Sequence, residues 1–169
     1  MDEKIAAYIK KIESKLGGKD PMKVQSATAK ELARLIKRAT PAKLKKRPMP
    51  EKWSVTEVIA HLADSEVVVG WRLRSILGAP GTPIQAYDQD AWAKEGNYGK
   101  RDARKSLEQF RVLREMNLAL VKSLTSEQRK RFGLHAERGE ESIDRLVLMM
   151  AGHDINHTEQ VEQILKRKK

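Results

Sequence analysis

Two histidines four residues apart, His153 and His157, are the residues in this sequence best suited to chemistry. They lie in residues 142–166, where apolar residues recur at helical spacing. Side chains four residues apart lie one above the other on a helix face, so both imidazoles can reach one metal ion. A third histidine, His61, lies in a second amphipathic segment, residues 53–77. Three neutral imidazoles from two helices would make an open site for a divalent metal.

The same histidines also have a structural interpretation, and spacing alone leaves both open. Each could be a core residue whose ring nitrogens are hydrogen-bonded to neighbours. His157 falls inside its apolar stripe and His153 at the margin, whereas His61 lies at the edge of its own stripe. An edge position suits a ligand facing a cleft and a half-exposed surface residue equally. The fourth histidine, His135, has no ligand spacing to the others, and we leave it out of the site.

Carboxylates close to these histidines are weak candidates for catalytic residues. Glu66 lies in the middle of an apolar stripe, so it needs a proton, a partner or water. Asp154 lies beside His157 and would hold a ring nitrogen of a neighbouring histidine across the core, or make an ordinary buried hydrogen bond. Glu57 is better explained by a capping box at the start of its helix. We expect Asp64 to be exposed.

The composition describes one cysteine-free domain. A chain of 169 residues, 40% of them hydrophobic, is long enough for one sizeable core and short for two. We therefore assign residues 1–169 to a single domain, with residues 1–21 as an N-terminal helical extension. The absence of cysteine excludes disulfides and thiolate ligands, so any metal must be held by nitrogen and oxygen. No signal peptide or membrane-spanning run is apparent, and we expect a cytoplasmic protein without a membrane partner.

The net charge of +11 raises the question of nucleic acid. The basic residues are spread along the chain and end in a tail at residues 166–169. Aromatic residues make up only 5% and do not alternate with the charges, as a base-stacking surface would require. A solvated basic exterior therefore explains the charge better than a nucleic-acid surface.

Helical periodicity recurs along the chain and predicts an all-α fold. The expected helices span residues 3–16, 26–39, 54–77, 101–123 and 142–166, with few strand signals between them. Four main helices imply a four-helix bundle, with the short N-terminal helix packed on the outside. Loops are expected at residues 43–50, 78–100 and 133–139.

Aromatic residues in the expected loop at 78–100 have two interpretations. Tyr87, Trp92 and Tyr98 would form a lid over the metal cleft with Asp88 at its rim, or would anchor the loop on the bundle. The same ambiguity holds for Trp71, which is expected in the core or at an interface.

Two motifs together resemble the DinB-like superfamily, which includes the YfiT-type proteins named as metal-dependent hydrolases. They are Trp53-Ser-Val-Thr-Glu-Val-Ile-Ala-His61 and His153-Asp-Ile-Asn-His157-Thr-Glu-Gln160, and the likeness extends over about residues 22–165. The resemblance implies an up-down-down-up four-helix bundle with a long crossover. It also implies that His61, His153 and His157 bind a divalent metal, which can be nickel, zinc, iron or manganese.

Such a site predicts a metal-dependent enzyme acting on a small-molecule substrate. A divalent ion would acidify a thiol or a water molecule, which favours S-transfer or hydrolysis respectively. The resemblance favours a low-molecular-weight thiol and implies a homodimer as a further expectation. The alternative is a non-catalytic basic helical bundle that binds nucleic acid or a stress-response protein partner.

Overall fold

Four long helices form the body of the protein in a computed structural model that describes residues 3–166. They are α2 (Pro21–Ile36), α4 (Val55–Gly78), α6 (Ala103–Ser123) and α8 (Ile143–Lys166). The side chains of Asp20, Ser54 and Asp102 cap α2, α4 and α6 by accepting hydrogen bonds from backbone N–H groups of the first turn. Most of the basic tail at residues 166–169 lies outside the described residues.

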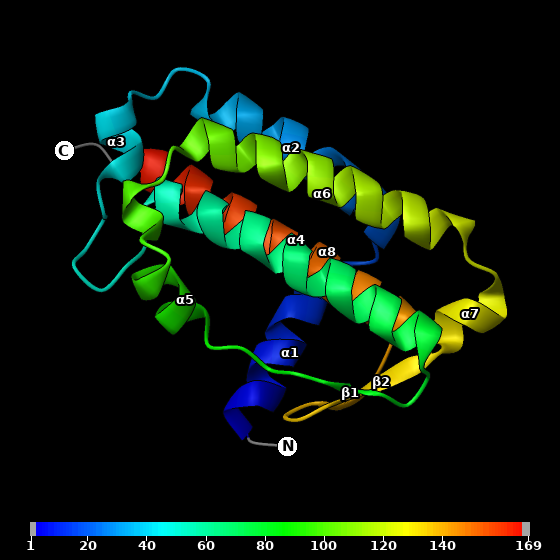
Figure 1. Cartoon of the computed structure of the whole chain (residues 1–169). Coiled ribbons are helices and arrows are strands. Elements are labelled where there is room, and N and C mark those ends of the chain that lie inside the picture. The colour runs from blue at the N-terminus through cyan, green and yellow to red at the C-terminus, as the bar shows by residue number, and fades with distance from the viewer. Residues whose placement is uncertain (1–2, 167–169) are drawn as a thin grey trace.

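The topology of the bundle is up-down-down-up, as the resemblance predicts. In Figure 1, α4 and α6 run in the same direction, and α2 and α8 run opposite to them. The chain therefore returns from the end of α4 to the start of α6 by a long crossover along the bundle. This crossover contains α5 (Gln89–Glu95) and the 3₁₀ turn η1 (Tyr98–Lys100), where a loop is expected from the sequence. A short helix, α3 (Pro41–Lys45), likewise begins just before the expected loop at residues 43–50.

A small sheet is the main departure from the expected helix-and-loop pattern. Strands β1 (Pro83–Ile84), β2 (Phe132–His135) and β3 (Gly139–Ser142) form a sheet in which β1 and β2 are parallel and β2 and β3 are antiparallel. A short helix, α7 (Ser126–Lys130), precedes β2. Strands of two to four residues are too short to show an alternating pattern, so periodicity could not reveal them. Gly139 begins β3 at a φ of 75°, which favours glycine in the hairpin turn.

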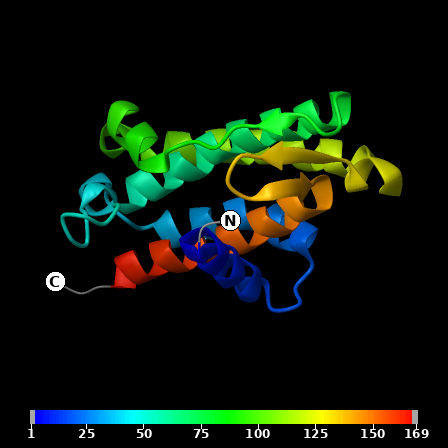
Figure 2. The same cartoon turned by 90° about the horizontal axis from the view of Figure 1, so that it is seen from below.

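The N-terminal helix α1 (Glu3–Leu16) packs across α8, as expected for an outer helix (Figure 2). The two backbones approach each other closely at Gly152, where a Cβ atom would lie 2.2 Å from the carbonyl oxygen of Ile12. Glycine at this position therefore allows α1 to lie directly over the part of α8 that carries His153.

The two larger apolar clusters of the core are separated by a polar layer, and a third, smaller cluster joins Ala60, Ala93 and Tyr98. One of the two larger clusters includes Leu32, Ile59 and Phe110, and the other includes Leu73 and Ile143. Between them lie buried polar side chains from all four long helices, namely Gln25, Thr28, Glu66, Arg114, Asn117 and Asp154.

Trp71 is not a core residue, because 71% of its surface is exposed on α4. Among the described residues, no helix combines the length and the apolar character needed to cross a lipid bilayer.

Candidate metal centre

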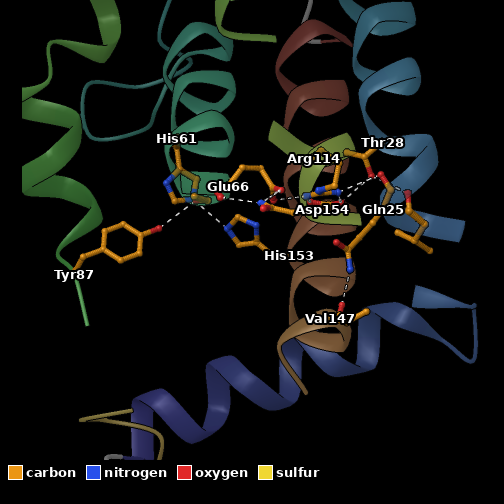
Figure 3. Close-up of polar contacts among 12 residues, drawn as sticks. Gln25, Thr28, His61, Glu66, Tyr87, Arg114, Val147, His153 and Asp154 are labelled. Atoms are coloured by element: carbon orange, nitrogen blue, oxygen red, sulfur yellow. Dashed lines mark hydrogen bonds and ion pairs between the residues drawn. The ribbon is translucent and has the colours of Figure 1, made fainter. Parts of the chain in front are cut away.

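The three histidines singled out from the sequence converge at one point between α4 and α8. His61, His153 and His157 each offer a ring nitrogen, and these nitrogens all lie within 4.8 Å of one another. The Nε2 atoms of His61 and His153 are 3.0 Å apart, and Figure 3 shows the two rings facing each other. His61 and His157 are buried and His153 is half-buried. The four-residue spacing on α8 therefore does place both rings towards the ring from α4.

The geometry fits a small divalent cation. Two imidazole ligands about 2.0–2.1 Å from a tetrahedral zinc ion are separated by roughly 3.4 Å, close to the observed His61–His153 spacing. The donor set consists of ring nitrogens alone, and neutral nitrogen donors of this kind suit zinc, nickel, copper or iron.

Burial keeps the three rings in the form that binds metal. It lowers the pKa of His61 to about 3, and the neighbouring His157 adds to the effect. Burial also lowers the pKa of His153 well below its ordinary value, with further contributions from the other two rings and Arg114. The pKa of His157 is lowered by burial as well. All three imidazoles are therefore neutral at pH 7, each with a lone pair available.

Gln160 orients one of the rings, a role that the sequence reasoning did not assign. The Nδ1 atom of His157 lies 2.8 Å from Oε1 of Gln160 one turn along α8, so the ring N–H donates to the amide oxygen. This contact leaves the Nε2 lone pair of His157 for the cluster. The signal in the sequence is the three-residue spacing between the two residues. Trp53 packs on the other side of the site, with its ring centroid 5.0 Å from that of His61.

The two candidate catalytic carboxylates lie in the polar layer, paired with Arg114 of α6. The Nη2 atom of Arg114 donates to Glu66 at 2.8 Å and to Asp154 at 3.0 Å (Figure 3). Thr28 donates to Asp154 at 2.9 Å, and Asn117 donates to Glu66 at 3.1 Å. Neither carboxylate belongs to the histidine cluster. Asp154 therefore makes buried contacts with Arg114 and Thr28, which fits the second of its two expected interpretations, a buried hydrogen-bonding residue.

Arg114 was also not identified from the sequence as the partner of these carboxylates. It lies four residues after Phe110 and three before Asn117, so its place on the inward face of α6 was visible in the periodicity. Because it is buried together with Glu66 and Asp154, it neutralises charge that would otherwise be costly beside the site.

The crossover provides both an anchor and part of the rim. Tyr98 is buried and donates to Asp64 at 2.7 Å, and Arg101 pairs with Asp64 at 2.9 Å. Tyr98 is thus an anchor and not a lid residue, and Asp64 is held in this contact instead of being freely exposed. Tyr87, in contrast, points towards His61 and His153 (Figure 3), with its hydroxyl 3.1 Å from that of Ser65.

A pocket of about 430 Å³ opens onto the centre. His153, Ser65 and Tyr87 contribute to its wall, together with residues of α1, the crossover, the β2–β3 hairpin and further positions on α4 and α8. Trp92, for which the sequence left a lid and an anchor open, packs against Tyr87 with ring centroids 4.8 Å apart and is 41% exposed. Asp88 caps α5 by accepting hydrogen bonds from the N–H groups of Asp90 and Ala91. The volume is that of a small-molecule site.

The fold and this centre define a helical-bundle protein with a three-histidine candidate metal site beside a pocket. The chain belongs to the DinB superfamily, whose family model matches residues 26–161.

Relatives found by sequence carry names that mention a metal. A protein of Oceanobacillus iheyensis named "putative metal-dependent hydrolase" is 29% identical over 116 residues, which are 69% of this chain and 67% of its own length. YfiT of Bacillus subtilis has the same description and is 27% identical over 116 residues, 68% of this chain and 65% of its own length.

Two solved structures share the fold. YfiT from Bacillus subtilis, described as having an unusual four-helix bundle topology, matches with a TM-score of 0.75 and 24% identity, covering 85% of this chain and 84% of that chain. The mycothiol-dependent maleylpyruvate isomerase matches with a TM-score of 0.67 and 10% identity, covering 83% of this chain and 59% of that chain.

Proposed function

We propose that this protein is a divalent-metal-dependent enzyme that acts on a small molecule, with His61, His153 and His157 holding the metal. The observation that carries the proposal is the convergence of three neutral ring nitrogens within 4.8 Å of one another, in a cluster that meets a small-molecule-sized pocket through His153. Structural zinc sites usually have four protein ligands, whereas catalytic sites have three and leave a position for water or substrate. Three histidines therefore fit a catalytic centre.

A divalent ion held there would supply Lewis acidity and lower the pKa of a thiol or water brought to it. The chain's own residues prepare the position. Gln160 fixes the ring of His157, and the neutral imidazoles add no negative charge. The hydroxyls of Ser65 and Tyr87 at the rim can donate to or accept from a bound substrate.

Glu66 and Asp154 act in this proposal as positioning residues. Through Arg114 they tie α4, α6 and α8 together at the level of the site. Since His61 is on α4 and the other two ligands are on α8, this ion-pair network fixes the distance between the two ligand-bearing helices.

We favour transfer to a low-molecular-weight thiol as the reaction. The sulfur forms a bond to an electrophilic carbon, the leaving group departs with the electron pair, and the thiol proton passes to solvent. The chain has no cysteine, so the sulfur must come from a separate thiol. The fold shared with a mycothiol-dependent isomerase supports this choice. Hydrolysis is the second candidate, supported by the names of the relatives at 27–29% identity.

Metal analysis of protein purified without a nickel column tests the foundation of the proposal. We expect about one divalent ion per wild-type chain and a loss of metal in His61→Ala and His153→Ala. His135→Gln is the matched control, because His135 lies outside the cluster, and it should retain the ion. Wild-type protein without stoichiometric metal would end the proposal.

The reaction is tested separately with the metal-loaded protein. Consumption of a thiol such as cysteine or glutathione, in the presence of a chlorinated aromatic electrophile, would report S-transfer. Release of nitrophenolate from a nitrophenyl ester without thiol would report hydrolysis. We expect the first activity to exceed the second and to disappear in His153→Ala. Ester cleavage that is indifferent to thiol would favour hydrolysis instead.

The other expectations stay predictions with their own tests. A homodimer would be seen by light scattering, and the exposed Trp71 offers an apolar contact for it. The non-catalytic alternative predicts binding to duplex DNA that weakens steeply with salt, by a slope of about −0.9 per phosphate contact. The cytoplasmic location is tested by cell fractionation.

A further inference from the structure

The pocket beside the metal centre extends well beyond the histidines along one face of α4. Its wall includes Ser65, Val68, Val69 and Arg72. Seven residues of helix span two turns, so Ser65 and Arg72 are about 10 Å apart along the axis. His153 of α8 contacts His61, which lies one turn before Ser65 on α4. Apolar side chains line the stretch between the two ends, and they include Val68, Leu146 and Met149.

Arg72 at the far end is a buried cation that forms no ion pair with a carboxylate of the described residues, and the nearby buried Glu141 is paired with Arg138 instead. Only 6% of the Arg72 surface is exposed. Its Nη2 atom donates a hydrogen bond to the Gln85 carbonyl oxygen at 2.6 Å and lies 3.3 Å from Nε2 of His135. The buried Nε atom has no partner among the described residues. Arg114, which is equally buried, is paired with two carboxylates. Buried charges are normally paired, so Arg72 is an exception that needs an explanation.

His135 contributes a second hydrogen-bond donor without an acceptor, its ring N–H, next to Arg72. The backbone N–H of Glu137 donates to its Nδ1 atom at 3.2 Å, while Arg72 approaches its Nε2 atom at 3.3 Å. A neutral imidazole has one acceptor nitrogen, so it cannot accept from both groups. Burial, with the charges of Arg138 and Arg72, lowers the pKa of His135 to about 4, so the ring is neutral at pH 7. The cluster therefore has more donors than acceptors.

The charged residues around Arg72 limit the charge of a ligand that could accept these hydrogen bonds. Arg138 is already held by Glu141 through two contacts of 2.6 and 2.8 Å, so it offers no free charge. Glu137 and Asp88 are exposed and also line the pocket. A single unneutralised cation next to acidic groups suits a singly charged anion better than a phosphate dianion.

We propose that Arg72, together with His135, binds the carboxylate of a small organic acid whose apolar part lies along Val68, Leu146 and Met149 and whose other end reaches the histidines. The identification of this acid as the substrate rests on the proposed function. The carboxylate site itself rests only on the pocket and its donors.

Binding of simple carboxylates to metal-free protein tests the site. Acetate, hexanoate and benzoate, and the amide of each, would be titrated into the protein and their binding compared by calorimetry. The metal is first removed with a chelator, so that no carboxylate can bind to an ion. We expect at least one acid with an apolar part to bind at least tenfold more tightly than its amide. Charge-assisted hydrogen bonds to a buried arginine give selectivity of about 10- to 100-fold.

Arg72→Met should remove the preference for the acid, while Arg74→Met should keep it. Arg74 is on the same helix but exposed and away from the pocket, so its loss changes the net charge equally. Arg72→Met should also fold, because an apolar side chain replaces an unpaired buried charge, and its unligated melting temperature should equal or exceed that of wild type.

Equal binding of acid and amide, retained preference in Arg72→Met, or no binding by any of the three acids would overturn the carboxylate site. These outcomes are independent of the metal. A protein that binds hexanoate through Arg72 but carries no metal would end the proposed function alone, and a metal-loaded protein without acid selectivity would end this inference alone.

Discussion

Gly152 of α8 and Ile12 of α1 meet through their backbones, with a would-be Cβ on Gly152 only 2.2 Å from the Ile12 carbonyl oxygen. The contact lies one residue before His153, and Ile12 and Tyr8 of α1 line the pocket. The N-terminal helix is thus part of the candidate site, although the family model begins only at residue 26.

Gly152→Ala should force α1 away from α8. A methyl group at that distance from backbone cannot be accommodated without movement, and overpacking of this kind typically costs about 1–3 kcal/mol. Hydrogen exchange should show faster exchange in α1, and urea unfolding should show reduced stability. Gly78→Ala is the control, since nothing lies within 4 Å of its would-be Cβ. Unchanged α1 protection in Gly152→Ala would contradict the close contact.

Arg114→Met should be strongly destabilising, by about 3–5 kcal/mol, because it leaves Glu66 and Asp154 buried without a cation. The triple variant that adds Glu66→Gln and Asp154→Asn should recover much of the loss, since no buried charge remains. Urea denaturation of both variants measures the difference. If the triple variant is no more stable than Arg114→Met, charge compensation is not the role of this network.

Gln160→Leu should weaken metal binding by about 10- to 100-fold, the usual effect of removing a group that orients a ligand histidine. Competition with a chelator of known affinity measures the change. Gln163→Leu is a matched control on the same helix, because Gln163 is exposed. Equal metal retention in the two variants would remove Gln160 from the site.

Removal of metal should lower the melting temperature of the wild-type protein. An ion bound to the folded state alone contributes about 2.7 kcal/mol at a free concentration 100 times its dissociation constant. His153→Ala should melt at the same temperature with and without the chelator. A wild-type protein that is indifferent to both chelator and added zinc, nickel, iron and manganese would contradict metal binding.

The free energy of unfolding should decrease as the pH is lowered from about 6.5 to 4, in part because His135 resists protonation in the folded protein. The pKa of this ring is about 4 in the folded protein, because of burial and the charges of Arg138 and Arg72, and about 6.5 when unfolded. The unfolded chain therefore binds more protons in this window, and each histidine contributes a slope of at most about 1.4 kcal/mol per pH unit. His135→Gln should show a shallower slope in metal-free, carboxylate-free buffers. Identical slopes would mean that the ring protonates freely in the folded state.

Much of the fold was visible in the sequence. The capping box at Ser54 and Glu57 is present as predicted, and the periodic segments became the long helices. The expected loops were predicted less well, because strands of two to four residues carry no readable period. In addition, β1 pairs with β2, which lies far away in the sequence. His135 was consequently expected in a loop and is instead buried in β2.

The sequence by itself determined which long helices form and that His153 and His157 share a face, since capping and periodicity act within one or two turns. Only the tertiary structure decided that His61, 92 residues before His153, completes their cluster. Packing likewise decided that Glu66 and Asp154 pair with Arg114, while Arg72 bonds to the Gln85 carbonyl oxygen and forms no ion pair within residues 3–166. The physical reason is that side-chain partners across a bundle are set by which helix faces meet, and the long crossover determines that arrangement.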